Sequence, residues 1–540
     1  MMPAAPTAVP LKATSREWLG LAVLALPCLL YSMDLTVLHL AIPKISADLR
    51  PTSAQLLWII DIYGFLVAGC LITMGTLGDR FGRRRLLLVG AAAFGVASVL
   101  AAFSRTTETL IASRAILGVA GATLAPSTLS LARNMFLDER ERTTAIAVII
   151  TSYSVGAAIG PLVGGVLLEL FWWGSVFLIS VPVMALLLVL GPRILVEYRD
   201  PGAGRPDLAS AALSLGAVLL VIFGLKQTAQ DGISAVSAAS TLAGLALATV
   251  FVRRQFRLAD PLIDLRLFRV PALSASLATY ALAILVLFGG FLFLPQYMQL
   301  VLGLSPLEAG LWSLPWALSF VVGSMLTPRL ARLTRPAYLM GAGLVVSALG
   351  FAVLTQISAS TGPVVVAVAS SVFALGTSPV FTLTNDLILG SAPPERAGAA
   401  AGISETGAEL AGALGIAVFG SMGIAIYRRT LASHLPADVP SGAADAARDT
   451  LGGAIAVASQ LPDRLAATLI EAARLAFIDG FHVAAAISTA GALALAVFVG
   501  LTLRHVREPA PAAEPEHAAP RLRAEPGCER SLWRVRPEEG

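Results

Sequence analysis

The chain has 540 residues, of which 56% are hydrophobic and only 13% are Asp, Glu, Lys or Arg. Soluble domains carry about 25% charged residues, so this composition excludes an ordinary array of soluble domains. The apolar residues fall into blocks of about 20, the length that an α-helix needs to cross about 30 Å of hydrocarbon. Because backbone groups find no water there, each block is predicted to be helical. The net charge is only +4, and no basic region interleaved with aromatics suggests nucleic-acid binding.

The first apolar block follows Lys12 and Arg16 and runs from Trp18 to Ile42. It is longer than the apolar core of a signal peptide, and no A-x-A cleavage site follows it. We therefore predict that this block is retained as the first membrane span.

Fourteen apolar blocks of this kind succeed one another along the chain. Residues 428–480 are instead predicted to form a long loop with a helical, partly amphipathic segment at 461–478. Residues 504–540, rich in Pro, Ala, Glu and Arg, are predicted to be a disordered tail. The predicted spans are 18–42, 56–76, 86–103, 110–132, 144–168, 175–195, 208–226, 236–252, 272–296, 307–328, 337–356, 363–389, 398–427 and 481–503.

Positive charge is distributed unevenly between the loops. The short loops that face the cytoplasm when the N-terminus is inside hold 19 arginines. The opposite short loops hold only four positive residues, Lys44, Arg50, Arg105 and Lys226. The positive-inside rule therefore predicts an even number of spans, both termini in the cytoplasm and segment 428–480 outside.

Several chemical motifs are missing from the sequence. No G-x-x-x-x-G-K-[ST] loop is present, which argues against ATP hydrolysis within the chain. There is no H-E-x-x-H and no Cys/His cluster with the spacing of metal ligands. We therefore expect neither an enzyme nor a metal site nor a bound cofactor.

The loop after the second span reads GTLGDRFGRRRL, from Gly75 to Leu86. Its simplest role is a basic loop that fixes membrane topology. The spacing, however, resembles the loop motif of the major facilitator superfamily. In that family the aspartate and the following arginine are implied to latch the cytoplasmic gate through charge pairs and a helix end. The candidate gating residues are Gly75, Asp79, Arg80, Gly82 and Arg83.

The fifth span carries small residues at four-residue intervals, in the string SVGAAIGPLVGG. Such residues allow close helix packing in any membrane protein. The string also resembles the antiporter signature of the same superfamily, which implies export of a substrate in exchange for protons. The candidate antiporter residues are Gly156, Gly160, Pro161, Gly164 and Gly165.

Three charged residues occur inside the apolar blocks of the first four spans. Asp34 lies about 12 Å below the outer end of the first span, at 1.5 Å per residue. Asp61 in the second span and Arg114 in the fourth lie nearer their outer ends, so that each either reaches the interface or has a buried partner. The sequence around them resembles fourteen-helix drug:proton antiporters, which implies that Asp34 and Arg114 act in proton coupling and Asp61 in cation recognition.

The thirteenth span reads AGISETGAELAGALGIAVFG and places Glu405 and Glu409 on one helix face at i and i+4. Two like charges on one buried face repel, so the pair is suited to take up and release a proton. A passive role, in which one glutamate attracts cations from a water-filled cavity, is the alternative. Some cation pumps of the family carry a further acid within the tenth span for dications, whereas here that span holds only Glu308, at its outer start. The resemblance therefore does not imply efficient recognition of dications unless Glu405 and Glu409 substitute.

The resemblance covers residues 15–505 and implies an all-α polytopic membrane protein with the major facilitator fold. Its fourteen transmembrane helices would form two six-helix bundles, related by a pseudo-two-fold axis along the membrane normal, with two helices inserted between them. The predicted domains are a cytoplasmic N-terminus 1–17, an N-terminal bundle 18–195, an inserted pair 196–271, a C-terminal bundle 272–503 and a cytoplasmic tail 504–540.

The function that follows is a proton-coupled multidrug efflux antiporter. It would export lipophilic cations, such as quaternary ammonium compounds and cationic dyes, across the bacterial inner (plasma) membrane by alternating access. The expected partners are these amphipathic cations, protons and the lipid bilayer, the energy source is the proton gradient, and we expect a monomer. The alternatives are an exporter of an endogenous metabolite or antibiotic and, from another class, a membrane sensor or scaffold whose outer loop binds a partner.

Overall fold

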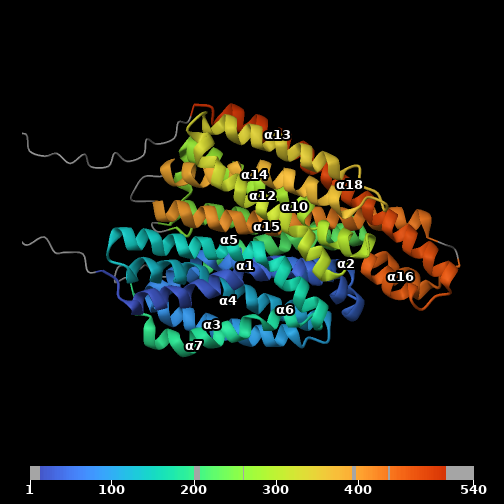
Figure 1. Ribbon diagram of the computed structural model, residues 1–540, viewed down its shortest axis with the longest axis horizontal. Helices are drawn as coiled ribbons and strands as arrows, with labels where there is room; N and C mark the ends of the chain where they lie inside the picture. Colours follow the sequence, from blue (N-terminus) through green and yellow to red (C-terminus); the bar gives the residue numbers. More distant parts are fainter. Residues whose placement is uncertain (1–11, 200–206, 259–260, 392–396, 436–437, 506–540) are drawn as a thin grey trace, which may run out of the picture.

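Long helices nearly parallel to one another make up the computed structural model (Figure 1). It describes residues 12–199, 207–258, 261–391, 397–435 and 438–505. Within these residues, fourteen helices are long and apolar enough to cross a membrane, as predicted. Two of the arginines used to predict the topology, Arg205 and Arg396, and most of the predicted tail lie outside the described residues.

The N-terminal half begins most of its helices at a side-chain cap. Thr14, Thr52 and Thr106 each form a capping box, which satisfies backbone N–H groups that a helix start leaves free. The sixth span is split near Ile179 into a short and a longer helix. The helices are α1 (Ser15–Leu49), α2 (Ser53–Phe81), α3 (Arg83–Ala102), α4 (Thr107–Met135), α5 (Glu139–Leu170), α6 (Ser175–Leu178) and α7 (Ser180–Ile194).

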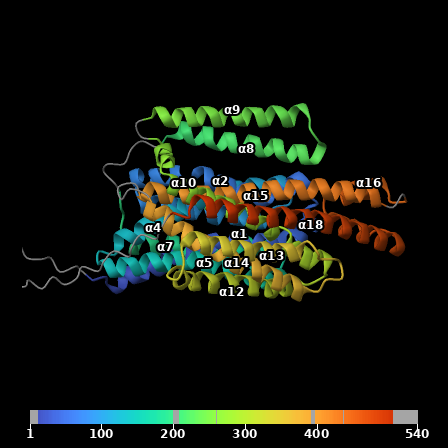
Figure 2. The ribbon, with the colours of Figure 1, turned by 90° about the horizontal axis from the view of Figure 1, so that it is seen from above.

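Two inserted helices, α8 (Leu208–Asp231) and α9 (Ala235–Arg257), form a hairpin on one flank of the molecule (Figure 2). α8 packs against α2 of the N-terminal half and α15 of the C-terminal half, whereas α9 packs mainly on α8. The hairpin therefore lies over a seam between the two halves.

The C-terminal half repeats the architecture of the first half, with a break after its first helix. There, a three-residue helix and a π-helical turn, η2 (Tyr297–Val301), continue the chain beyond Phe291. The helices are α10 (Pro271–Phe291), α11 (Leu294–Gln296), α12 (Pro306–Ala331), α13 (Pro336–Leu354), α14 (Pro363–Ser391), α15 (Ala397–His434) and α18 (Asp463–Thr502), preceded by the short 3₁₀ helix η1 (Leu265–Arg269).

Segment 428–480 differs from the predicted long loop. α15 continues to His434, and α18 begins at Asp463, so the amphipathic segment and the last span are one helix of 40 residues. Between them lie α16 (Ser441–Asp449) and α17 (Leu451–Ala458). Hydropathy placed the ends of the spans at the limits of the apolar runs, but helices continue through polar residues once these protrude past the bilayer.

α16 and α17 connect the two halves at one end of the molecule. The Ser53 hydroxyl donates to the backbone carbonyl of Asp449 at 2.6 Å, and Gly452 packs on Ser46. Burial raises the pKa of the Asp449 carboxyl above its usual value. The same end holds a second contact between the halves, from the Gln299 amide to the Leu40 carbonyl at 3.0 Å.

The arginine-rich loops lie at the opposite end, where the described chain both begins and ends (Figure 1). Arg16 donates to the Arg193 carbonyl and Arg335 to the Arg504 carbonyl. The main chain at Ala13 donates to Glu141. The charge asymmetry of the sequence is thus an asymmetry between the two ends of the folded molecule.

Candidate functional site

A cavity of ≈ 250 Å³ lies between the two halves. Its polar lining includes Asp61, Arg114 and Glu409, and the rest of its wall is largely apolar and aromatic. The wall is contributed by α1, α2, α4 and α5 from one half and by α10, α12 and α15 from the other. An apolar cavity with a few convergent charges is the usual form of a small-molecule site.

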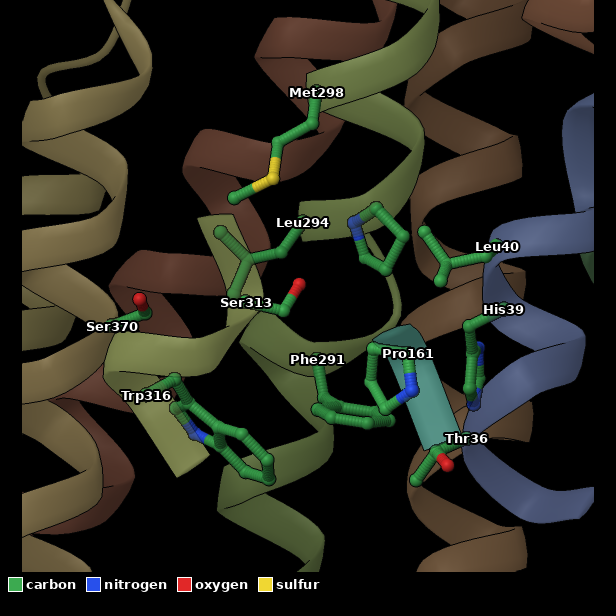
Figure 3. Close-up of a pocket in the computed structure, with 11 residues that line it drawn as sticks. Thr36, His39, Leu40, Pro161, Phe291, Leu294, Met298, Ser313, Trp316 and Ser370 are labelled. Atoms are coloured by element: carbon green, nitrogen blue, oxygen red, sulfur yellow. The ribbon is translucent and has the colours of Figure 1, made fainter. Parts of the chain in front are cut away.

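A smaller pocket of ≈ 30 Å³ adjoins the cavity and shares residues with it. Figure 3 shows Thr36 and His39 on one side and Phe291 and Trp316 on the other, with Pro161 beside Phe291. His39 is buried, its ring meets Phe291 edge to face at 5.0 Å, and its Nδ1 has no hydrogen-bond partner within the described structure. It lines both pockets, and among the described residues no group of three or more His, Cys, Asp and Glu is arranged to hold a metal ion.

Arg114 has a buried partner and does not reach the interface. Its Nη1 is 2.7 Å from Asp34 Oδ2, and the two side chains are 1% and 7% exposed. Its remaining nitrogens donate to the carbonyls of Ile59 and Ile60, and its guanidinium lies 4.9 Å from the ring centre of Tyr63. One arginine therefore joins α4, α1 and α2, through three of its five N–H donors.

Asp61 also has a buried partner, which the sequence analysis had placed in a loop. Lys226 belongs to α8, and its Nζ is 2.8 Å from Asp61 Oδ1, with side chains 1% and 0% exposed. The same Nζ lies 3.8 Å from the ring centre of Trp58. The prediction of Lys226 as an outer-loop charge was wrong, because α8 continues past the predicted end of the seventh span and the lysine turns inward.

The two glutamates of α15 have different surroundings. Glu409 lines the cavity and accepts a hydrogen bond from the Tyr31 hydroxyl across the seam at 2.7 Å. Glu405, one turn nearer the arginine-rich end, is exposed. Among the described residues, neither glutamate forms an ion pair with a lysine or arginine.

The aromatic residues of the C-terminal half separate into two groups. Phe291 and Trp316 line the cavity, and Phe320 continues from Trp316 as a stacked ring at 6.4 Å. Phe293 and Tyr297 instead pack on Phe481 of α18, away from the cavity.

The motif loop after α2 contacts its own residues and the segment that follows α7. Arg83 pairs with Asp79 at 2.6 Å, as an i, i+4 pair across the start of α3. Gly82 has φ +113°, and a Cβ there would lie 2.5 Å from Glu197 Oε1. Glu197 accepts from the Arg84 backbone N–H at 3.0 Å, which places a carboxylate at the helix N-terminus. The predicted latch across the gate stays a prediction.

The glycine string of α5 serves two different interfaces. A Cβ at Gly156 would lie 2.1 Å from the Leu29 carbonyl oxygen, and Cβ atoms at Gly160 and Gly164 would lie 2.0 Å and 2.7 Å from side chains of α1. Gly165 faces the Pro306 carbonyl of the other half, and the Pro161 carbonyl faces Gly310. The string therefore brings α5 close to α1 within one half and to α12 across the seam.

The structure brings four of the five predicted charged residues to one place. Asp61, Arg114 and Glu409 line the cavity, and Asp34 is bonded to Arg114. The sequence analysis missed Tyr31, Lys226 and Glu197. Lys226 was detectable as one of only three lysines, whereas nothing in the sequence pointed to Glu197.

We expect Arg114→Ala to lower the stability of the purified protein by about 3–5 kcal/mol, because it leaves Asp34 buried without its counter-charge. Thermal unfolding in detergent measures the loss. The double variant Asp34→Asn with Arg114→Gln removes both charges and should recover much of it. Equal losses in the single and double variants would contradict a role of the pair itself.

We expect Gly156→Ala to destabilise the protein by about 1–3 kcal/mol, because its Cβ meets the backbone of α1 and cannot be relieved by a side-chain rotation. Gly500→Ala in α18 is the matched control, since nothing lies within 4 Å of its Cβ position. Thermal unfolding of the two variants side by side measures the difference, and equal melting temperatures would refute the close approach of α5 to α1.

The sequence model of the Major Facilitator Superfamily matches residues 24–416. The chain is 43% identical to the multidrug efflux pump LfrA of Mycolicibacterium smegmatis, over 91% of this chain and 97% of that one. It is 36% identical to the methyl viologen resistance protein SmvA of Salmonella typhimurium, over 90% and 98%.

A solved structure shares the fold at low sequence identity. It is a bacterial homologue of the human lysosomal transporter Spinster in an inward-facing and unoccupied conformation, with a TM-score of 0.61, 17% identity and coverage of 91% of this chain and 98% of that one. Together with the fourteen helices and the loop motif, these findings show that the chain is a multi-pass membrane transporter that belongs to the Major Facilitator Superfamily.

Proposed function

We propose that this transporter exports lipophilic cations in exchange for protons. The observation that carries the proposal is Glu409, a carboxylate without a cationic partner that lines an aromatic-walled cavity between the halves. Aromatic faces attract cations, and a carboxylate in such a place exchanges a proton for a cation without a change in the charge of the site. The multidrug efflux pump LfrA, 43% identical, supports export of drugs as the direction of transport.

Contacts between the halves support alternating access with the cavity open toward the arginine-rich end. At the other end, α5 meets α12, and α1 and α2 meet Gln299 and Asp449. Toward the arginine-rich end, Gly402 and Gly407 of α15 face open space and Glu405 is exposed. If that end is cytoplasmic, a drug enters from the cytoplasm or the inner leaflet.

In the proposed cycle, the cation enters the cavity and takes the place of a proton at Glu409 or Glu405. The halves then rock about the seam, so the contacts of α5 with α12 open and those near the arginine-rich end close. The cation leaves to the outside, and a proton from the outside restores the carboxylate. Arg114 stays paired with Asp34 and fixes α1 against α2 during these steps.

Everted membrane vesicles test the coupling. Addition of tetraphenylphosphonium to vesicles that hold a proton gradient should release protons with the wild-type protein, and the release should fall to the level of empty vesicles in Glu409→Gln. Tyr31→Phe is the matched control, since it removes one hydrogen bond from Glu409 and keeps the carboxylate. Full proton release after replacement of Asp34, Glu405 and Glu409 together by their amides would refute coupling through these carboxylates, and no release by the wild type above that of empty vesicles would refute the antiport.

Substrate identity requires a separate measurement. We expect a strain that expresses the protein to tolerate cationic dyes and quaternary ammonium biocides, and a protonophore should abolish this tolerance. Tolerance to a neutral or anionic antibiotic alone would favour the export of an endogenous metabolite. No solute flux at all in proteoliposomes would favour a sensor or scaffold.

We also propose the bacterial inner membrane as the location, with both termini in the cytoplasm. The gathering of the arginine-rich loops at the end where the described chain begins and ends supports this orientation. A periplasmic reporter enzyme inserted between α16 and α17 should be active, and one fused after Leu503 should be inactive. The reverse pattern would overturn the orientation.

A further inference from the structure

Lys226 is a buried cation that the inserted hairpin contributes beside the cavity. Its Nζ pairs with Asp61 Oδ1 and lies over the ring of Trp58, and its own side chain is not part of the cavity lining. Asp61 therefore has Lys226 on its far side and the cavity on its near side. The second carboxylate oxygen, Oδ2, is buried without a hydrogen-bond partner within the described structure.

The pair is not needed to attach the hairpin. α8 meets α2 and α15 through an apolar cluster of its own, with buried Phe65 and Ile222 and partly buried Trp58 and Val218. An apolar pair of similar volume is often as stable as a buried ion pair or more so. A buried lysine at this place therefore calls for a reason other than attachment.

The charges around the cavity give a reason for the buried lysine. Asp34 is neutralised by Arg114 and Asp61 by Lys226, both at hydrogen-bonding distance. Glu409 and Glu405 have no cationic side chain as an ion-pair partner among the described residues. Of the four acids, two are balanced by the protein itself, and the neighbouring glutamates repel one another, so that a single net negative charge is the favoured state.

We propose that Lys226 sets the charge preference of the cavity, so that it takes monocations and disfavours dications. A ligand with one positive charge balances the glutamate pair. A second positive charge meets Asp61 already neutralised by Lys226 and is left without a counter-charge in a poorly solvated site, where charge interactions are strong. Removal of Lys226 frees the Asp61 carboxylate as a second anionic contact.

This inference rests on the proposed binding of cations, and the same purified protein tests both. Binding of tetraphenylphosphonium, a monocation, and methyl viologen, a dication, is measured by calorimetry in nanodiscs at pH 6.5 and 8.5. We expect Lys226→Met to raise the affinity for methyl viologen relative to tetraphenylphosphonium on the order of tenfold at pH 8.5. The gain should be smaller at pH 6.5, where the freed Asp61 can take up a proton.

Three variants serve as controls. Lys226→Arg keeps the charge and should keep the wild-type ratio of the two affinities. Lys44→Met removes a lysine that bonds the Leu168 carbonyl away from Asp61, and it should also keep that ratio. Asp61→Asn combined with Lys226→Met removes both charges, leaves no unpaired charge to unfold the protein, and should return the ratio to that of the wild type.

The outcomes separate the two proposals. Binding of tetraphenylphosphonium by the wild type with an unchanged ratio in Lys226→Met overturns the role of Lys226 and leaves the proposed function standing. No binding of either cation by the wild type overturns both. If Lys226→Met does not fold, Asp61→Asn decides, because it leaves Lys226 positive beside the cavity and must weaken binding of the dication more than that of the monocation.

Discussion

The hydrogen-bonded pair of Arg114 and Asp34 is the interaction on which the arrangement of the N-terminal half depends. An unpaired guanidinium in an apolar interior has a large desolvation cost, so Arg114 needs an anion and several hydrogen-bond acceptors at fixed positions. Asp34 of α1 and the carbonyls of Ile59 and Ile60 of α2 provide them. These bonds hold three helices at the depth of the cavity, and the wall that the cavity presents to a ligand follows from their positions.

The same logic extends to the inserted hairpin. Asp61 on α2 is buried and its partner is contributed by α8, a helix outside both six-helix bundles. The hairpin lies on the flank of the molecule (Figure 2), but its Lys226 forms an ion pair with Asp61, which lines the cavity. The inserted hairpin thus adds a charged side chain beside the cavity, from a part of the fold that lies outside the two six-helix bundles.

Glycines allow a close approach of the two halves at the seam. Where α5 meets α12, the contacting atoms are backbone carbonyls and glycines, Gly165 with Pro306 and Gly310 with Pro161. Interfaces of this type bring helices together without interlocking side chains. The same string also brings α5 against α1, through Gly156, Gly160 and Gly164. One short string of residues thus forms a contact within its own half and a contact with the other half.

The sequence by itself determined the number of spans, the family and the set of charged candidates, because a membrane demands apolar blocks of fixed length and makes every buried charge conspicuous. The ends of the helices could not be predicted from hydropathy. Segment 428–480 is largely helical, because polar residues do not end a helix beyond the bilayer. Only the tertiary structure decided which charge neutralises which. Asp61 and Lys226 are 165 residues apart, and Tyr31 and Glu409 are 378 apart, so no local pattern encodes their meeting, and the packing of the helices alone distinguishes an acid left for a ligand from one that the protein has already balanced.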